Sequence, residues 1–244
     1  MNGVETVAFC GTLWEKGQKE KNEDSLAFWH MKKGKDNQVL AIICDGIGGL
    51  QEGEQASSYV VRKIADWFMS EGYKMNQNRK KEMRLQQICY QIHEELRTYG
   101  KEKGIRLGTT MTMLLLNNKK FIWAHCGDCR LYLIRREKIR KITQEHCEKN
   151  GAINRALGAG EWRLVNVGIC KVKKKDAFLL CTDGFYRNLD KEVLQIWAKR
   201  KIEDEKQAER MLKQIYQKKI SMGEKDNISA IYFGVGKKKR EEVK

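Results

Sequence analysis

At residues 39–49 the chain reads VLAIICDGIGG, a continuous apolar run that ends abruptly in Asp45 and Gly46. Such a run, bounded by turn-forming residues, is typical of a buried central strand. The strand would carry the Asp45 carboxylate at its tip, where glycine lets the backbone approach a bound group closely. The sequence therefore predicts a functional carboxylate at the end of a central strand.

Four further aspartates stand where an apolar stretch meets a turn: Asp24, Asp128, Asp183 and Asp226. They are spread over most of the chain, so they can share a task only if the fold gathers them. Several carboxylates without histidine or cysteine ligands suit hard cations, Mg²⁺ or Mn²⁺. Any single aspartate could simply favour turn geometry, but the recurrence at strand ends indicates a shared cation site.

Apolar periodicity along the chain predicts the order of strands and helices. Strands are expected at residues 4–13, 25–31, 39–44, 109–116, 120–126, 130–135, 163–172, 177–181 and 228–235. Helices are expected around residues 57–68, 85–96, 191–199 and 205–220, where apolar residues recur at helical spacing. The short turns at 117–118 and 127–128 predict an antiparallel meander from 109 to 135.

This order of elements indicates an α+β fold, a layered sandwich of antiparallel strands with helices inserted in pairs. A length of 244 residues and a hydrophobic content of 41% suit one well-buried domain. We expect the domain to span residues 1–236 and a charged, disordered tail to follow at 237–244.

The charge balance and the cysteines restrict the classes of function. An excess of 48 basic over 32 acidic residues gives a net charge of +16, which favours anionic partners. The basic residues are dispersed and lack the spacing of known nucleic-acid-binding motifs, so no specific nucleic acid is expected. No stretch approaches 18 apolar residues, and the N-terminus lacks a signal-peptide pattern. We therefore expect a cytoplasmic protein without a membrane span, whose eight cysteines are reduced.

Cys126 and Cys129 form a C-x-x-C pair beside His125, which invites a zinc or redox interpretation. A structural zinc site needs four ligands, and no second pair at comparable spacing is present in the sequence. His125 alternates with Phe121 and Trp123, the pattern of a strand residue whose ring is satisfied by a hydrogen bond. We therefore expect both cysteines to fill small-residue positions of a strand and turn.

Eight short blocks follow one another along almost the whole chain. They are Asn22-Glu23-Asp24-Ser25; Asp45-Gly46-Ile47-Gly48-Gly49 with Gly53-Glu54 and Ala56-Ser57; Gly108-Thr109-Thr110; AHCGDCRLY at 124–132; ITQEH at 142–146; Arg155-Ala156-Leu157-Gly158; Cys181-Thr182-Asp183-Gly184; and Asp226-Asn227-Ile228. In this order they resemble the metal-dependent serine/threonine protein phosphatases of the type 2C family, particularly its compact bacterial members. One Asp-Gly pair is common, whereas eight ordered blocks are very hard to produce by chance.

The resemblance implies a four-layer αββα sandwich, in which two central antiparallel sheets are flanked by helix pairs. It also implies two Mn²⁺ or Mg²⁺ ions between the sheet edges. Asp45 would bridge both ions, and the backbone carbonyl of Gly46 would ligate one of them. Asp183 and Asp226 would complete the coordination of the other ion, so the three aspartates would be the catalytic residues.

Four further positions around the centre follow from the same resemblance. Glu23 matches an acidic ligand of some relatives, and Asp24 matches a neighbour that holds the centre through water. Asp128 with Asp183 matches a weaker third metal site. Five residues before Asp24, where the family usually carries an arginine that binds the substrate phosphate, this chain has Lys19. Lysine supplies charge without bidentate geometry, so phosphate binding should survive but weaken.

Two more departures concern the surroundings of the centre. Ile47 stands where animal relatives have a histidine proposed as general acid, which leaves solvent or a metal-bound water to protonate the departing alkoxide. Only residues 147–154 lie between His146 and Arg155, whereas relatives generally insert a longer segment that includes a flap at the active site. The shorter connection predicts a more open cleft.

The sequence thus predicts an enzyme that hydrolyses phosphoserine and phosphothreonine in proteins by direct attack of a metal-bridging water on phosphorus. Two cations about 3.5–4 Å apart can activate this water and neutralise the phosphoryl group, so no protein nucleophile is needed. Its partners would be the phosphoprotein substrates of a bacterial serine/threonine kinase, and it would act as a monomer. Two alternatives are an inactive relative that binds phosphoproteins as a regulatory module and a basic nucleic-acid-binding protein.

Overall fold

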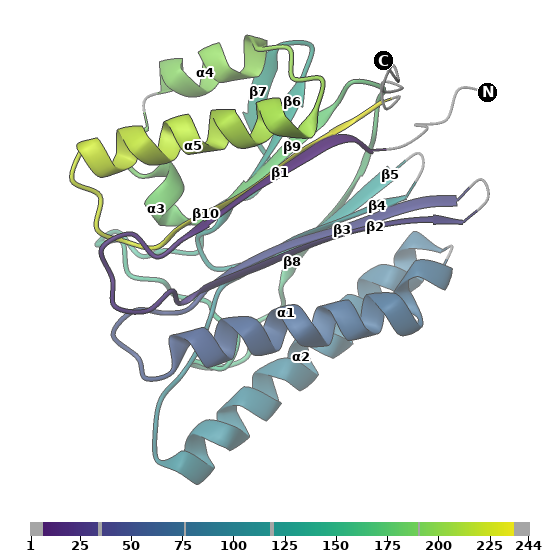
Figure 1. Ribbon diagram of the computed structural model, residues 1–244. Helices are drawn as coiled ribbons and strands as arrows, with labels where there is room; N and C mark the ends of the chain where they lie inside the picture. The colour runs from purple at the N-terminus through teal and green to yellow at the C-terminus, as the bar shows by residue number, and fades with distance from the viewer. Residues whose placement is uncertain (1–6, 34–35, 76, 118–119, 190, 237–244) are drawn as a thin grey trace.

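Two five-stranded antiparallel sheets face each other in the computed structural model, which describes residues 7–33, 36–75, 77–117, 120–189 and 191–236 (Figure 1). The first sheet contains, in spatial order, β1 (Val7–Glu15), β10 (Ile228–Val235), β9 (Ala177–Cys181), β6 (Arg130–Arg135) and β7 (Lys138–Lys141). The second sheet contains β2 (Asp24–Lys33), β3 (Asp36–Asp45), β4 (Met111–Asn117), β5 (Lys120–Cys126) and β8 (Asn166–Lys171).

Helix pairs cover the outer faces of both sheets (Figure 1). The second sheet is covered by α1 (Gly53–Ser70) and α2 (Asn78–Lys103), and the first by α4 (Lys191–Lys199) and α5 (Glu205–Ser221). Short helical turns are η1 (Gly72–Lys74) and α3 (Asp183–Tyr186). The predicted α+β sandwich of four αββα layers is therefore confirmed. None of the helices in the described ranges is long and apolar enough to cross a membrane.

The helices form because their apolar residues repeat at intervals of three and four. In α1 the side chains of Ala56, Val60, Ile64 and Phe68 are buried in the core under the second sheet. The N-terminus of α5 is capped by Asp204, whose carboxylate accepts a hydrogen bond of 2.8 Å from the Gln207 amide. These patterns explain why the sequence predicted the long helices.

The central position of β3 explains its continuous apolar run. Val39, Ala41 and Ile43 pack between the two sheets, whereas Leu40 and Ile42 pack on the other face against α1 and α2. A strand that is buried on both faces needs apolar residues at every position. The strand therefore ends in Asp45 at the edge of two packed layers.

A cluster of aromatic rings joins the sheets across the central layer. We define the inter-sheet aromatic cluster as Phe121, Phe178, Phe233 and Phe28, whose successive ring centroids are 4.9, 5.2 and 5.2 Å apart. Phe28 and Phe121 come from the second sheet, and Phe178 and Phe233 come from the first. The contacts between the sheets are edge-on or tilted, and these closely packed rings help to set the distance between the sheets.

The predicted meander from 109 to 135 was wrong in its last strand. β4 and β5 pair with each other, but β6 leaves them and pairs with β9 in the first sheet. Gly127, at a φ of 107°, turns the chain from one sheet to the other, and a side chain there would meet Thr110 at 2.5 Å. The prediction also missed β7 and α3, while residues 4–6 and the tail at 237–244 lie outside the described residues.

Candidate metal centre

The start of β2, the end of β3 and the start of β10 lie at one end of the sandwich, where β1 leads into β2 (Figure 1). We define the carboxylate cluster as Asp24, Asp45, Asp128, Asp183 and Asp226. Asp24 opens β2 directly opposite Asp45, which ends β3; Asp183 follows β9 and Asp226 precedes β10. Burial and then the negative charges of the other four raise the pKa of Asp45 well above its usual range. The fold therefore gathers all five predicted aspartates.

The Gly108-Thr109-Thr110 block fixes the backbone of Asp45. The Asp45 amide donates to Thr110 Oγ1 at 2.9 Å, and the Asp45 carbonyl accepts from the Thr110 amide at 2.9 Å. The Thr109 hydroxyl donates to the same carbonyl at 2.8 Å. Since the Asp45 amide and carbonyl are both hydrogen-bonded, its carboxylate is the group that remains available to a ligand.

Thr182 holds Asp24 from the opposite sheet. Its hydroxyl donates to Asp24 Oδ2 at 3.0 Å, and the Ser229 amide donates to the same hydroxyl oxygen at 3.1 Å. Asp24 is 1% exposed, and burial raises its pKa to about 7. The role of Thr182 was missed, because the sequence does not show which strands face each other.

Glu23 and Gly46 are placed by contacts with Gly53 and Asn227. The Gly46 amide donates to the Glu23 carbonyl at 3.1 Å, and the Glu23 amide donates to Asn227 Oδ1 at 2.9 Å. A Cβ at Gly53 would lie 2.8 Å from Glu23 Oε1, so glycine leaves room for this carboxylate. Burial raises the pKa of Glu23. Glu23 thus borders the cluster beside the Gly46 backbone.

Two cations border the cluster, one predicted and one not. Lys19 Nζ lies 3.4 Å from Asp226 Oδ1, and the Lys19 side chain is 42% exposed. Arg187 pairs with Asp183, and its Nη1 lies 3.6 Å from Asp226 Oδ2. Arg187 lies four residues after Asp183, directly beyond α3, and the sequence motifs did not include it.

The donor set fits a hard divalent cation. Asp24 Oδ1 and Asp128 Oδ1 are buried and have no hydrogen-bond partner among the described residues. Burial, with the nearby Asp183 charge, raises the pKa of Asp128 to about 6. Buried carboxylate oxygens without donors are costly unless a cation or proton neutralises them. Since the donors are oxygens, Mn²⁺ or Mg²⁺ suits them better than a soft metal.

Cys129 lies close to the cluster but does not suit a metal. Its Sγ and one oxygen each of Asp45 and Asp128 lie within 4.8 Å of one another. Burial raises the pKa of the Cys129 thiol well above its usual range, whereas a metal ligand must be a thiolate. Cys126 packs towards α1 and α2 while Cys129 packs between the sheets. The two therefore fill small positions in separate cores, as the sequence predicted.

His125 has the structural role that its strand pattern predicted. It is fully buried, and its Nε2 donates to the Gln144 carbonyl at 3.0 Å. Its Nδ1 then accepts from the Thr112 hydroxyl at 2.8 Å. Burial lowers the pKa of His125 to about 3, so the ring is neutral. Both ring nitrogens are used within the core, which leaves no lone pair for zinc.

The shortened connection forms a compact turn. Cys147 and Ile153 make an isolated antiparallel bridge, and the Glu148 amide donates to the Ala152 carbonyl at 2.8 Å. Gly151, at a φ of 84°, closes the turn. These short-range bonds fold residues 147–154 upon themselves.

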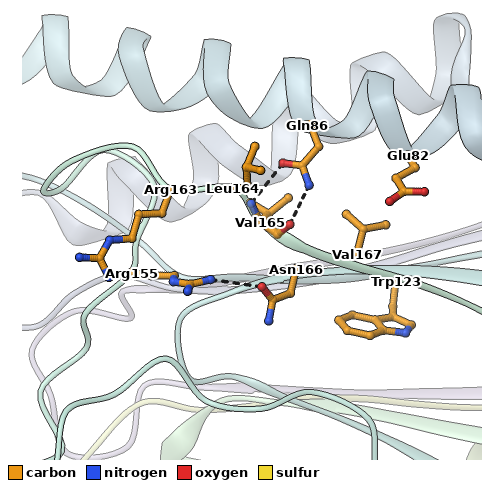
Figure 2. Close-up of a pocket in the computed structure, with 9 residues that line it drawn as sticks. All are labelled: Glu82, Gln86, Trp123, Arg155, Arg163, Leu164, Val165, Asn166 and Val167. Atoms are coloured by element: carbon orange, nitrogen blue, oxygen red, sulfur yellow. Dashed lines mark hydrogen bonds between the residues drawn. The ribbon is translucent and has the colours of Figure 1, made fainter.

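A cavity of about 700 Å³ lies away from the carboxylate cluster, between α2 and the edge strand β8 (Figure 2). Two pairs of its polar groups are hydrogen-bonded to each other. Gln86 exchanges two hydrogen bonds with the Val165 backbone, of 2.7 and 3.2 Å, and Arg155 donates to Asn166 Oδ1 at 3.2 Å. None of the described residues that line it belongs to the carboxylate cluster. The cavity is therefore separate from the candidate metal centre.

Asp24 allows a test of the electrostatics of the centre. Its pKa of about 7 in the folded state exceeds the unfolded value of about 3.9, so the native state binds the proton more tightly. Stability is therefore lost as pH rises through this window. In EDTA, the melting temperature of Asp24→Asn relative to wild type should increase between pH 5 and pH 8. Thermal denaturation across this range measures the difference, and a constant difference would contradict the burial of a charged Asp24.

Comparison with known proteins relates the site to a family. The model of the family described as "Protein phosphatase 2C" matches residues 15–219. The serine/threonine phosphatase stp of Listeria monocytogenes serotype 4b is 28% identical over 184 residues, which are 67% of this chain and 71% of that protein. A putative protein phosphatase of Mycoplasma genitalium is 25% identical and covers 95% of this chain and 97% of its own.

Solved structures share the fold. The serine/threonine phosphatase Stp1 of Staphylococcus aureus superimposes with a TM-score of 0.81 at 23% identity, over 93% of this chain and 95% of that one. The catalytic domain of the phosphatase PstP, solved with 2 manganese ions, has a TM-score of 0.76 at 21% identity over 95% and 99% of the chains. The resemblance drawn from the eight blocks is thus confirmed. From the matched family model and the common architecture, this chain belongs to the protein phosphatase 2C family.

Proposed function

We propose that the protein is a metal-dependent phosphatase that hydrolyses phosphoserine and phosphothreonine in proteins. The observation that carries the proposal is the carboxylate cluster, in which Asp24 and Asp128 keep buried oxygens without a partner among the described residues. Family membership and the phosphatases named among its relatives support the same activity. The proposed catalytic domain spans residues 1–236.

The proposed ligands divide between the two sheets. Asp45, Asp183 and Asp226 would hold two Mn²⁺ or Mg²⁺ ions, with the Gly46 carbonyl and Glu23 at the same centre. When bound, the two ions would supply a water activated for in-line attack on phosphorus and would neutralise the phosphoryl group. A solved relative that contains 2 manganese ions supports the kind and number of ions in this proposal.

The remaining residues orient the centre. Asp24, fixed by Thr182, would hold the ions through water, and Asp128 with Asp183 would form a weaker third site. Ile47 offers no proton, so the departing alkoxide would be protonated by solvent or by a metal-bound water. The proposed enzyme acts as a monomer in the cytoplasm on phosphoproteins made by a bacterial serine/threonine kinase.

Hydrolysis of a phosphothreonine peptide by the purified protein, with and without Mn²⁺, tests the proposal. Turnover that needs Mn²⁺ supports the enzyme. Tight peptide binding without turnover would support the inactive binding module instead. Salt-sensitive binding of random DNA would show only nonspecific electrostatics from the +16 charge.

The position of Lys19 predicts how this residue affects turnover. Its ammonium lies at the cluster but cannot donate two parallel hydrogen bonds to phosphate oxygens as a guanidinium does. Lys19→Arg should raise kcat/KM for a phosphothreonine peptide by about threefold, and Lys19→Ala should lower it by about tenfold. Steady-state kinetics at saturating Mn²⁺ measure both values. If Lys19→Ala leaves kcat and KM unchanged, Lys19 does not contact the substrate.

A further inference from the structure

We infer that Arg187 is a second phosphate-binding residue, which supplies the planar guanidinium that Lys19 lacks; the inference rests on the proposed function. Arg187 follows α3 and reaches back over the carboxylate cluster, where it pairs with Asp183 and Asp226. Its side chain is 54% exposed, so the guanidinium lies at the solvent-facing side of the site.

Arg187 and Lys19 both pair with Asp226, through different oxygens of its carboxylate. Lys19 Nζ lies 3.4 Å from Oδ1, and Arg187 Nη1 lies 3.6 Å from Oδ2. Lys19 also interacts electrostatically with Glu23 and Asp45. Arg187 also interacts electrostatically with Asp183 and Asp128. An anion held beside Asp226 would therefore lie near both cations.

A buried ion pair fixes the main chain from which Arg187 extends. Lys219 is 1% exposed, donates to the Arg187 carbonyl and pairs with Glu224 Oε2 at 2.9 Å. Glu224 Oε1 in turn accepts from the Asp226 amide at 3.2 Å and from the Lys225 amide at 3.1 Å. Lys219 and Glu224 thus join the segment that carries Arg187 to the segment that carries Asp226. Such anchoring places the guanidinium at the site before any ligand arrives.

The chemistry of the ligand suits this arrangement. A phosphate monoester is a dianion whose oxygens accept two parallel hydrogen bonds from one guanidinium. Lys19 supplies a single point charge, so it cannot make the two parallel hydrogen bonds that a guanidinium offers to phosphate oxygens. When cations bind Asp183 and Asp226, these carboxylates no longer depend on Arg187 for neutralisation. The guanidinium is then available to phosphate oxygens.

Binding of inorganic phosphate to the Mn²⁺-loaded protein tests the inference without requiring turnover. Isothermal titration calorimetry should show that Arg187→Gln weakens phosphate binding by roughly ten- to hundredfold, the range of a charge-assisted hydrogen bond. Arg187→Lys should lie between Arg187→Gln and wild type. Arg210→Gln is the matched control, because Arg210 is exposed on α5 and should leave phosphate affinity unchanged.

A purely neutralising role of Arg187 gives a different result. In that case Arg187→Gln would change Mn²⁺ affinity but leave phosphate affinity, measured at saturating Mn²⁺, at the wild-type value. This outcome would overturn the inference and leave the proposed function intact. An inactive wild type that still binds phosphate through Arg187 would refute the function instead. Failure of the Mn²⁺-loaded wild type to bind phosphate would overturn the inference.

Discussion

The Asp45→Asn variant should hydrolyse phosphopeptides about 10³-fold more slowly than wild type while it stays folded. A bound cation stabilises the transition state by several kcal/mol, and about 4 kcal/mol corresponds to about 10³-fold in rate. The backbone bonds of Asp45 to Thr109 and Thr110 do not involve the carboxylate, so the fold should persist. Loss of one negative charge among buried carboxylates should keep or raise the melting temperature of the metal-free protein.

The measurements for Asp45→Asn are kcat at saturating Mn²⁺ and thermal denaturation in EDTA. Asp183→Asn should lose activity to a similar extent. Asp66→Asn is a matched control, because Asp66 is exposed on α1 and should keep wild-type activity. Near-normal turnover of a well-folded Asp45→Asn or Asp183→Asn would remove that residue from the catalytic centre.

Removal of divalent cations should abolish hydrolysis, because the proposed nucleophile is a water activated by metal ions at the carboxylate cluster. Added Mn²⁺ should restore the activity. Mn²⁺ that binds only the native state should also raise the melting temperature. A ligand at about 100 times its Kd stabilises the native state by about 2.7 kcal/mol. The assay measures phosphate release from a phosphothreonine peptide after the protein is dialysed against EDTA, and then during titration with Mn²⁺.

The Asp45→Asn protein serves as a control for this titration. It should lose most of the Mn²⁺-dependent rise in melting temperature, because a ligand of the proposed centre is missing. Full activity in excess EDTA, or a trapped covalent phosphoenzyme, would show that the reaction follows a different mechanism.

The sequence predicted those parts of the fold that local patterns determine. β3 was evident because burial on both faces makes every residue from Val39 to Cys44 apolar. The long helices were evident because their buried residues repeat every three or four positions. The aspartates were evident because each interrupts an apolar run or begins a turn, and the resemblance assigned them a common site.

Features that depend on which strands face each other could not be predicted from local patterns. The turn at Gly127 looks like a hairpin in sequence, and only the pairing of β6 with β9 shows that it crosses between sheets. Thr182 contacts Asp24, and Arg187 contacts Asp226, from segments far apart in the sequence, so no spacing or periodicity revealed these contacts. Asn227 was noted in a motif, but its hydrogen bond to the Glu23 amide joins residues that lie 204 positions apart in the sequence.

The inter-sheet aromatic cluster has a consequence for the spacing of the carboxylates. Asp24 and Asp45 belong to the second sheet, while Asp183 and Asp226 adjoin the first, so the thickness of the layer between the sheets affects their separation. Phe178 and the other rings of the cluster fill part of that layer. A substitution that changes the size of one of these rings should therefore alter the distance between the carboxylates of the two sheets, with every carboxylate left in place.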